Sequence, residues 1–466
     1  MTKANALTAD TLPRADWRFV AQNIRRVRGD RMGIFTALLK KYGDAAALRL
    51  GPVVLHVFGH PEHAQHILQT NQKNYRRDHH VNEPVKLFTG QTMFTTDGEP
   101  WLRQRRLMQP AFHRRQLTRL AEITVAVTDR MLTRWREAQE QPLDMQSEMT
   151  RTTLEIIGLA LFSAQLTGHQ TTANHTVDHE AALGQALLEG NEFVIYQIDI
   201  PITPPLWVPT PRNQRFNAAM REIDSFLYSL IDDRTENPMS DERQHDLIDM
   251  LLNARDEESG EGMSKQQVRN EMVSLFSAGH ETTANALTWT LYLLSQHPDE
   301  AVKVQTEVDT VLGDRLPTAD DLTALLYTRQ VIEESLRLYP PAWALVRESI
   351  EDDVVGGWTV PAGGQVTIAI AEIHRHPEYW DAPNEFRPER FAPEQETARH
   401  RFAYMPFGGG PRQCIGKHFA LTEATLILAM LMQRVECQLA PDYVVQTKTI
   451  ITLHARDGLP MNLVWR

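Results

Sequence analysis

The stretch Phe407-Gly-Gly-Gly-Pro-Arg-Gln-Cys414-Ile-Gly416 places one of the chain's two cysteines in a glycine-rich turn. Gly410 and Gly416 allow the backbone to bend where a Cβ atom would clash. Apolar residues at helical spacing follow from about 417 to 433, so Cys414 is expected at a helix N-terminus. There the helix dipole favours a thiolate over a thiol. A thiolate held by backbone N–H groups is a metal ligand or a nucleophile.

Two simpler interpretations of this turn compete with a reactive thiolate. The Lys-Ser or Lys-Thr pair of a phosphate-binding loop does not follow Gly416. A buried core thiol is the usual fate of a lone cysteine. The spacing Phe-x-x-Gly-x-Arg-x-Cys-x-Gly favours the thiolate. It resembles the pattern by which the cytochrome P450 superfamily holds haem iron, and every position matches, from Phe407 to Gly416.

The length is large for one domain but does not exclude one, and the composition is sufficient for a large core. The chain has 466 residues, of which 42% are hydrophobic. A net charge of −12 argues against nucleic-acid binding. Cys414 and Cys437 form no disulfide framework, and residues 1–31 contain no apolar run suited to a signal peptide or a membrane span. The sequence therefore predicts a cytoplasmic protein without a membrane span.

The resemblance implies a fold and an organisation. The fold is mainly α with a smaller β-rich lobe, expected at about 44–75 and 340–372 within a single haem domain spanning 1–466. Since only about 50 residues follow Cys414, no fused reductase is expected. The implied cofactor is haem b with the Cys414 thiolate as axial ligand and O₂ as co-substrate.

A long buried helix is predicted from Ser264 to about Gln296. Ser264 and Gln267 form a capping box, and the span reaches roughly 48 Å. Its apolar middle contains Ala278-Gly-His-Glu281-Thr282-Thr283, where Gly279 weakens the helix by about 1 kcal/mol relative to Ala, which suggests a functional kink. Alternatively, Thr282 bonds back to its own helix and Glu281 is held in a salt bridge.

This segment resembles the family's oxygen-activation signature. The resemblance implies that Ala278 and Gly279 open a groove for O₂, that Thr282 hydrogen-bonds the bound oxygen, and that Glu281 relays protons. It also implies that Trp101 and Arg105, four apart on a short helix, bind a haem propionate, because an Arg fork suits a carboxylate. Arg347 and Arg412 are candidates for the second propionate.

A further motif group is structural. Glu334 and Arg337 on a predicted helix, with Arg390 in Pro383-x-x-Phe-x-Pro-x-Arg390-Phe391, match the family's buried ion-pair network. The resemblance implies that these three residues hold the region of the loop that contains Cys414, residues 407–416, called the cysteine loop below. His374-x-His376 resembles a metal motif, but the segment running to Trp380 is similar to the family's polar connector, and a metal site is not expected there.

A basic cluster on and after the Trp101 helix stands out in an acidic protein: Arg103, Arg106, Arg114, Arg115 and Arg119. It is either a solvated face or, by resemblance, the side on which a ferredoxin-type or flavodoxin-type donor with an NAD(P)H reductase docks, near Lys417 and His418. Acidic partners would be steered to such a patch.

The substrate is expected to be a small lipophilic molecule, with a fatty acid or a terpenoid-like compound as the guess. Residues 81–96 are interpreted as an apolar loop that either lines the pocket or only covers the core. The pocket residues expected are Phe88, Phe276, Trp343 and Leu345. The proline-rich stretch 200–212 is a lid over the entrance or a plain rigid connector.

The implied reaction is insertion of one oxygen atom from O₂ into a C–H bond or across a C=C bond. A peroxygenase using H₂O₂ and a haem-thiolate isomerase or dehydratase are alternatives within the enzyme class. The intact Glu281-Thr282 pair opposes both of them. The alternative from another class is a haem-binding sensor without turnover.

Overall fold

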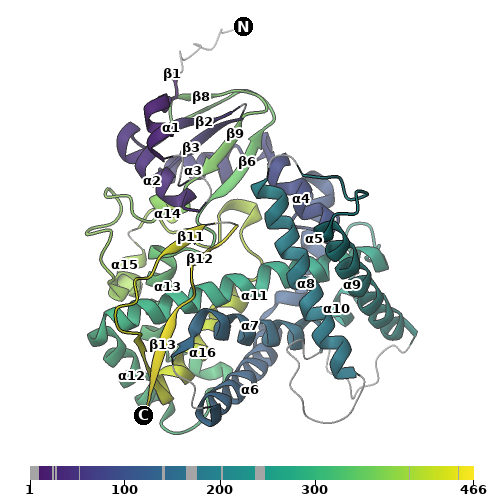
Figure 1. Ribbon diagram of the computed structural model, residues 1–466, viewed down its shortest axis with the longest axis vertical. Helices are drawn as coiled ribbons and strands as arrows, with labels where there is room; N and C mark the ends of the chain where they lie inside the picture. The colour runs from purple at the N-terminus through teal and green to yellow at the C-terminus, as the bar shows by residue number, and fades with distance from the viewer. Residues whose placement is uncertain are drawn as a thin grey trace. The chain divides into compact units, whose positions relative to one another are not determined.

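The computed structural model describes residues 10–23, 26, 29–51, 53–138, 142–163, 176–200, 203–236, 247–397, 399–449 and 451–466. The chain divides into two compact units. Figure 1 labels most of the helices and strands named below. Unit 1 comprises residues 1–81, 336–414 and 447–453, and unit 2 comprises 82–335, 415–446 and 454–466. Unit 1 holds most of the strands and unit 2 most of the helices, so the prediction of a mainly α fold with a smaller β-rich part is confirmed.

Unit 1 is built around a five-stranded sheet in the order β2-β3-β9-β6-β4. The strands are β2 (Ala45–Leu50), β3 (Val53–Phe58), β9 (Gln365–Ile368), β6 (Leu345–Ser349) and β4 (Tyr75–Arg77). β2 and β3 form an antiparallel hairpin, which the sequence predicts around Gly51-Pro52, and Gly51 has φ +63°. β3 then pairs in parallel with β9. A smaller sheet has the order β1-β8-β7, made of Asp10–Thr11, Trp358–Val360 and Asp353–Val355.

Apolar residues of this sheet and of short helical segments form a buried core in unit 1. Phe58, Val366 and Ile368 of the sheet pack with Ile67 and Phe402 in one buried cluster. The helices are α1 (Trp17–Asn23), α2 (Arg31–Tyr42), α3 (Pro61–Gln65), α14 (Ile370–Ile373) and α15 (Pro393–Glu396).

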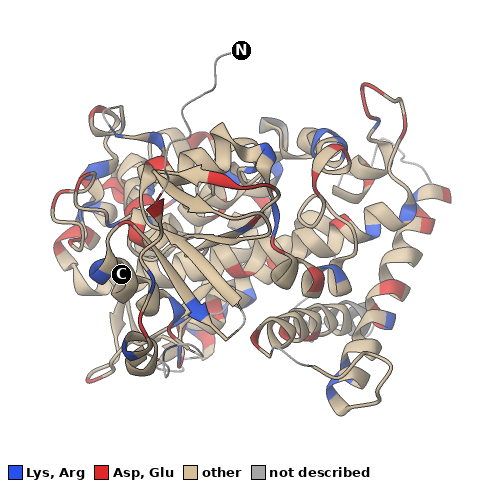
Figure 2. Ribbon diagram, turned by 90° about the horizontal axis from the view of Figure 1, so that it is seen from above, with Lys and Arg blue, Asp and Glu red and all other residues tan. Residues whose placement is uncertain are grey.

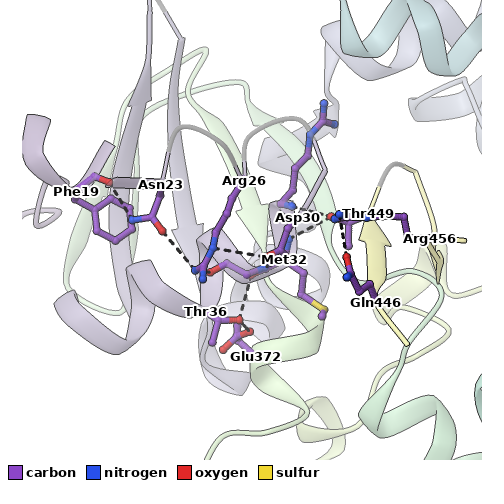
Figure 3. Close-up of polar contacts among 12 residues, drawn as sticks. Phe19, Asn23, Arg26, Asp30, Met32, Thr36, Glu372, Gln446, Thr449 and Arg456 are labelled. Carbon is purple, nitrogen blue, oxygen red and sulfur yellow. Dashed lines mark hydrogen bonds and ion pairs between the residues drawn. The ribbon is translucent and has the colours of Figure 1, made fainter. Parts of the chain in front are cut away.

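The first turn of α2 is held by a residue from far along the chain (Figure 3). Thr449 of β11 (Thr447–Thr449) accepts hydrogen bonds from the backbone N–H groups of Arg31 at 2.7 Å and Met32 at 3.5 Å. Thr36, one turn further along α2, donates its hydroxyl to Glu372 at 2.5 Å. These contacts satisfy donors that a helix start leaves open.

Unit 2 is a helical assembly organised around α11 (Lys265–Gln296), which packs most extensively on α7 (Met145–Phe162). The capping box of Ser264 and Gln267 is present, as predicted. The other helices are α4 (His79–Thr89), α5 (Gly98–Met108), α6 (Arg114–Ala138), α8 (Thr176–Asp199), α9 (Pro211–Glu236), α10 (Leu247–Asn253), α12 (Pro298–Leu312), α13 (Leu326–Leu338) and α16 (Lys417–Arg434). The first residues of α4 and the last of α13 belong to unit 1. Within the described ranges, none of these helices combines the length and apolar character that crossing a lipid bilayer requires.

Unit 2 also carries a three-stranded antiparallel sheet in the order β10-β13-β5, made of Val435–Leu439, Pro460–Trp465 and Leu143–Asp144. Cys437 lies in β10, as the sequence predicted. The remaining short strand, β12, spans Leu453–Ala455.

Two sequence-based assignments of secondary structure were wrong. The sequence of residues 17–42 predicts one helix, but the stretch contains both α1 and α2, because Asp30 caps a new start by accepting the N–H of Gly33 at 2.9 Å. Residues 79–89, interpreted as part of a loop, form α4 in spite of Pro84 within it. The structure does not describe residues 1–9, Pro201 or 237–246, so the predictions for those stretches are outside it.

Candidate active site

The cysteine loop of unit 1 owes its shape to close packing at its glycines. Gly410 has φ +68°, and a Cβ atom there would lie 1.9 Å from the carbonyl oxygen of Leu68. A Cβ atom on Gly409 would lie 2.5 Å from the ring of Phe402. Gly416 differs, because its φ of −84° suits any residue and its conformation does not require glycine.

Cys414 presents its side chain at the end of this loop. Its backbone N–H donates to the carbonyl oxygen of Phe407 at 2.9 Å, which closes the loop, and its side chain is exposed. Cys437 is the contrasting case, because burial raises the pKa of its thiol to about 12. Of the two cysteines, Cys414 is therefore the one that can offer a thiolate to a ligand.

The polar segment of α11 keeps its helical assignment throughout, but side chains reach several of its carbonyl groups. Thr282 donates its hydroxyl to the carbonyl oxygen of Ala278 at 2.8 Å, and Thr283 donates to that of Gly279 at 3.2 Å. Thr153 of α7 donates to the carbonyl oxygen of His280 at 3.0 Å. The back-bonding considered for Thr282 is thus present, and such bonds bend helices slightly.

Helix packing explains why position 279 is a glycine. A Cβ atom at this position would lie 2.9 Å from Cδ1 of Ile157 on α7. The glycine therefore lets α11 and α7 approach closely next to Glu281 and Thr282, which explains a residue that is unfavourable inside a helix.

Glu281 lies close to a histidine from the C-terminal part of unit 2. Oε1 of Glu281 lies 3.7 Å from Nδ1 of His454, and both side chains are half-buried. The neighbouring His280 points elsewhere, with its Nδ1 2.8 Å from the carbonyl oxygen of Phe276. Glu281 is thus within reach of a proton-carrying group.

Comparison with known proteins decides the family. The family model described as Cytochrome P450 matches residues 13–456. This chain belongs to the cytochrome P450 family. Its members are haem enzymes with a cysteine thiolate ligand that use O₂, so the protein is an oxidoreductase of the monooxygenase type.

Curated relatives of this P450 come from plants and bacteria. LUTEIN DEFICIENT 5 from Arabidopsis thaliana is 34% identical over 95% of this chain and 76% of its own length. Cyclooctatin synthase from Streptomyces melanosporofaciens is 36% identical over 86% of this chain and 84% of its own. Pentalenene oxygenase from Streptomyces avermitilis is 31% identical over 93% of this chain and 92% of its own.

The fold also matches solved P450 structures. The crystal structure of the cytochrome P450DA heme domain superposes with a TM-score of 0.87 at 26% identity and covers 98% of both chains. The residues of this P450 suit a haem, because the exposed Cys414 is presented on a loop that is sterically fixed at Gly410.

The residues expected to bind the haem propionates lie in both units of this P450. Trp101 and Arg105 are half-buried on α5 of unit 2. Arg347 of β6 is buried in unit 1, where its Nη1 donates to the carbonyl oxygen of Val346 at 2.8 Å. Arg412 belongs to the 3₁₀ turn Gly410–Arg412, next to Cys414. Their role toward the propionates stays a prediction.

Arg337 fastens the connector that leads to the cysteine loop. Glu334 and Arg337 are both completely buried on α13. Arg337 donates to the carbonyl oxygens of His374 at 3.0 Å, Pro383 at 2.6 Å and Glu385 at 2.9 Å. Arg390 donates to that of Ala382 at 2.9 Å. These bonds suit the structural role that the sequence suggested.

The two histidines of His374-x-His376 have different surroundings. Nε2 of His374 accepts the N–H of Met405 at 2.8 Å, and burial lowers its pKa to about 3. His376 lies beside Asp44 and His60, a group whose ligand atoms are close enough for a metal. However, Nδ1 of His376 and of His60 each accept a backbone N–H. In a neutral ring Nε2 then carries the proton, and Nε2 of His376 lies at hydrogen-bond distance, 3.2 Å, from Oδ1 of Asp44.

The expected pocket residues differ in exposure. Phe88 and Phe276 are fully buried in the core of unit 2. Trp343 is buried against Phe35, with ring centroids 5.6 Å apart. Leu345 is half-buried, and its Cδ1 would lie 3.6 Å from a Cβ atom on Gly408 of the cysteine loop. Their assignment to a substrate pocket stays a prediction.

The basic cluster is partly neutralised. Arg106 binds Asp256 at 2.9 Å and Glu258 at 3.0 Å, and Arg103 lies 3.6 Å from Glu261. Figure 2 shows both basic and acidic segments scattered over the ribbon. The remaining candidates for a docking patch in unit 2 are Arg119, which bonds Ser163, and the helix start at Lys417 and His418. The side chains of Arg114 and Arg115 are outside the described structure.

Sequence reasoning missed two groups of residues. His454 was not recognised as a partner of Glu281, since only the fold brings β12 to α11. Arg269, Asn270 and Glu271 were also missed, although three consecutive polar residues in a buried helix were a visible signal.

Proposed function

We propose that this P450 inserts one oxygen atom from O₂ into a lipophilic, terpenoid-type substrate. The observation that carries the proposal is the loop 407–416, which matches the haem-binding pattern at every position. Close packing at Gly410 fixes this loop, and the loop presents Cys414. We further propose that the bound group is haem b. Bound there, the haem would supply O₂ binding and its reductive activation.

The chain's own residues have distinct tasks in this proposal. Cys414 contributes the thiolate ligand. The hydroxyl hydrogen of Thr282 is used on Ala278, so its oxygen is free to accept a hydrogen bond from a water molecule. Glu281, paired with His454 at 3.7 Å, would pass protons from solvent toward that water. Trp101, Arg105, Arg347 and Arg412 would bind the propionates, and Phe407, Ala278, Gly279 and Gly416 would shape the two faces of the haem site.

The substrate class is supported by relatives and by apolar side chains. Pentalenene oxygenase, 31% identical, is named for a terpene hydrocarbon. Leu87 and Phe94 are large exposed apolar side chains in the stretch expected to line the pocket. A compact hydrocarbon skeleton is held by apolar burial and needs few polar partners. A fatty acid is the second substrate class, and it would require a cationic partner for its carboxylate.

The electron source is proposed to be a separate ferredoxin-type or flavodoxin-type protein with an NAD(P)H reductase. Arg119, Lys417 and His418 are the basic side chains proposed to face an acidic donor, while Arg103 and Arg106 lie against acidic residues of this chain. A cytoplasmic location remains part of the proposal.

The test is a titration of a substrate library followed by haem absorbance, combined with turnover using surrogate redox partners. Terpene hydrocarbons should shift the iron to high spin and give oxygenated product with NADPH consumption. Shifts obtained only with polar compounds would contradict the substrate class. If product forms with H₂O₂ but not with NADPH and redox partners, the protein is a peroxygenase. If a rearranged product forms without O₂ uptake, it is an isomerase or dehydratase. Spectral shifts without any product would indicate a sensor.

A further inference from the structure

The segment between α4 and α5 is a compact turn fixed by its own hydroxyl groups. Oγ1 of Thr95 donates to the carbonyl oxygen of Gly90 at 2.9 Å and accepts the N–H of Thr92 at 2.8 Å. Asn82 of α4 donates to the carbonyl oxygen of Thr95 at 2.9 Å. These hydrogen bonds tie the segment 88–96 into one compact unit.

Two neighbouring residues of α11 hold this segment in place. Arg269 is buried, and its Nη1 donates to the carbonyl oxygen of Phe88 at 3.3 Å while its Nε binds Asp224 of α9 at 2.7 Å. Asn270 lies against Gly90, where a Cβ atom would approach Nδ2 of Asn270 to 2.4 Å. Gly90 also has φ +76°, so no other residue fits this contact without strain.

Glu271 is the third contact and the most unusual. Its side chain is 1% exposed, and Oε1 accepts the N–H of Met93 at 2.8 Å. Burial raises the pKa of Glu271 to about 8, and the Met93 N–H is the opposing influence. Its charged neighbour Arg269 is directed to Asp224, and among the described residues burial and the Met93 N–H are the influences on the Glu271 pKa. A neutral acid therefore holds the turn at neutral pH.

The held segment carries both a core anchor and exposed apolar surface. Phe88 is buried, and a Cβ atom on Gly190 of α8 would lie 2.1 Å from its ring. Phe94, next to the residue that Glu271 binds, is 46% exposed. A large apolar side chain on a rigidly held backbone is typical of a ligand-binding wall.

We propose that Arg269, Asn270 and Glu271 form a clamp that positions Phe94, and that Glu271 thereby controls which lipophilic substrates the protein accepts. This inference rests on the proposed function, because it takes segment 88–96 as a wall of the substrate site. Glu271 is a positioning residue, since it acts through the backbone of Met93.

The clamp has a pH dependence with a definite sign. An undocked Glu271 ionises near the ordinary 4.5, whereas the docked side chain ionises near 8. Between these values undocking is coupled to the loss of a proton, so docking weakens as pH rises from 4.5 to 8. Above 8 both states are ionised and the weakening is complete.

The first experiment compares Glu271→Gln with Glu271→Leu in the full haem-loaded chain by amide hydrogen exchange. Gln keeps an acceptor for the Met93 N–H and cannot ionise, while Leu removes the acceptor. We expect the exchange rate of residues 90–96 in the wild type, divided by that of the Gln variant, to rise about tenfold or more from pH 6 to pH 8.5. The Leu variant should lose protection at both pH values. Glu423→Gln, which replaces a second buried acid whose pKa is about 8, is the matched control and should leave this segment unchanged.

The second readout is selectivity. Dissociation constants for a compact and an elongated hydrocarbon ligand are measured by the spin-state shift, and their ratio should change about fivefold or more in Glu271→Leu but not in Glu271→Gln. A flat exchange ratio with pH, or an unchanged ligand ratio in a folded Leu variant, overturns the clamp even if turnover is normal. If the Leu variant does not fold, the Gln comparison still decides. Failure of the protein to oxygenate any substrate would refute the proposed function and leave the exchange result standing.

Discussion

Cys414 and Cys437 differ in chemical character because their surroundings differ. Cys414 is exposed on a loop whose backbone is closed by its own N–H, whereas Cys437 is only partly exposed in β10 and has a pKa of about 12. A reactive thiolate needs a low pKa and access, so Cys414 is better suited to this role than Cys437.

The first prediction concerns this pair. Cys414→Ser should remove the thiolate-type absorption of the reduced CO complex and abolish oxygenation, because serine does not supply a thiolate to iron. Cys437→Ser should retain that spectrum. The measurement is the CO difference spectrum at equal haem content. A thiolate-type spectrum in the Cys414→Ser protein would show that another residue ligates the iron.

The second prediction concerns Thr282. Thr282→Ala removes the hydroxyl whose hydrogen is bonded to Ala278, and with it the acceptor that would hold a water molecule. We expect haem binding to persist while product per NADPH falls about tenfold or more and H₂O₂ rises. Thr283→Ala, which removes the neighbouring bond to Gly279, is the control. Equal coupling in the wild type and Thr282→Ala would count against proton delivery through this residue.

At the scale of elements, α11 and the cysteine loop illustrate what sequence can and cannot specify. The capping box and the length of α11 were predictable because capping and apolar spacing are local properties. Two contacts of α11 could not be predicted, because the partner residues come from other elements. They are the approach of Ile157 to Gly279 and the contact of His454 with Glu281. α4 was missed because Pro84 interrupts its pattern and only its last turn is buried.

The third prediction tests the cysteine loop as an element. Gly410→Ala combines a left-handed φ with a clash against the Leu68 carbonyl oxygen, so we expect a loss of stability of roughly 3 kcal/mol or more and poor haem retention. Gly363→Ala has nearly the same φ, +71°, with no atom within 4 Å of the added methyl group. It should cost about 1 kcal/mol. Thermal unfolding and haem content of both variants give the comparison, and equal effects would exclude the close approach as the cause.

At the scale of the whole molecule, the family was predictable because motifs in a fixed order survive when the rest of a sequence diverges. The pairing of Arg106 with Asp256 and Glu258 was not predictable. This pairing makes the positive charge of the basic cluster smaller than the sequence indicated. Electrostatics depends on which loops meet, and sequence proximity does not report that.

The fourth prediction concerns pH and overall stability. Burial raises the pKa of Glu423 to about 8, against 4.5 for an ordinary glutamate. The folded protein therefore keeps a proton that the unfolded chain releases, and stability falls as pH rises from 4.5 to 8. Glu423→Gln should be more stable than the wild type by about 3 kcal/mol at pH 7 and by about 1 kcal/mol at pH 5. Unfolding curves at the two pH values measure this, and a pH-independent difference would refute it.

The hydrogen bonds of Arg337 have a consequence for engineering. Their three acceptors at His374, Pro383 and Glu385 are all main-chain carbonyl groups, which every amino acid provides. A graft that replaces residues 383–385 by the equivalent residues of a relative would supply the same main-chain carbonyl acceptors. Chimaeras joined in this connector should thus tolerate foreign side chains far better than chimaeras joined inside the cysteine loop, where Gly410 leaves no room for a substitute.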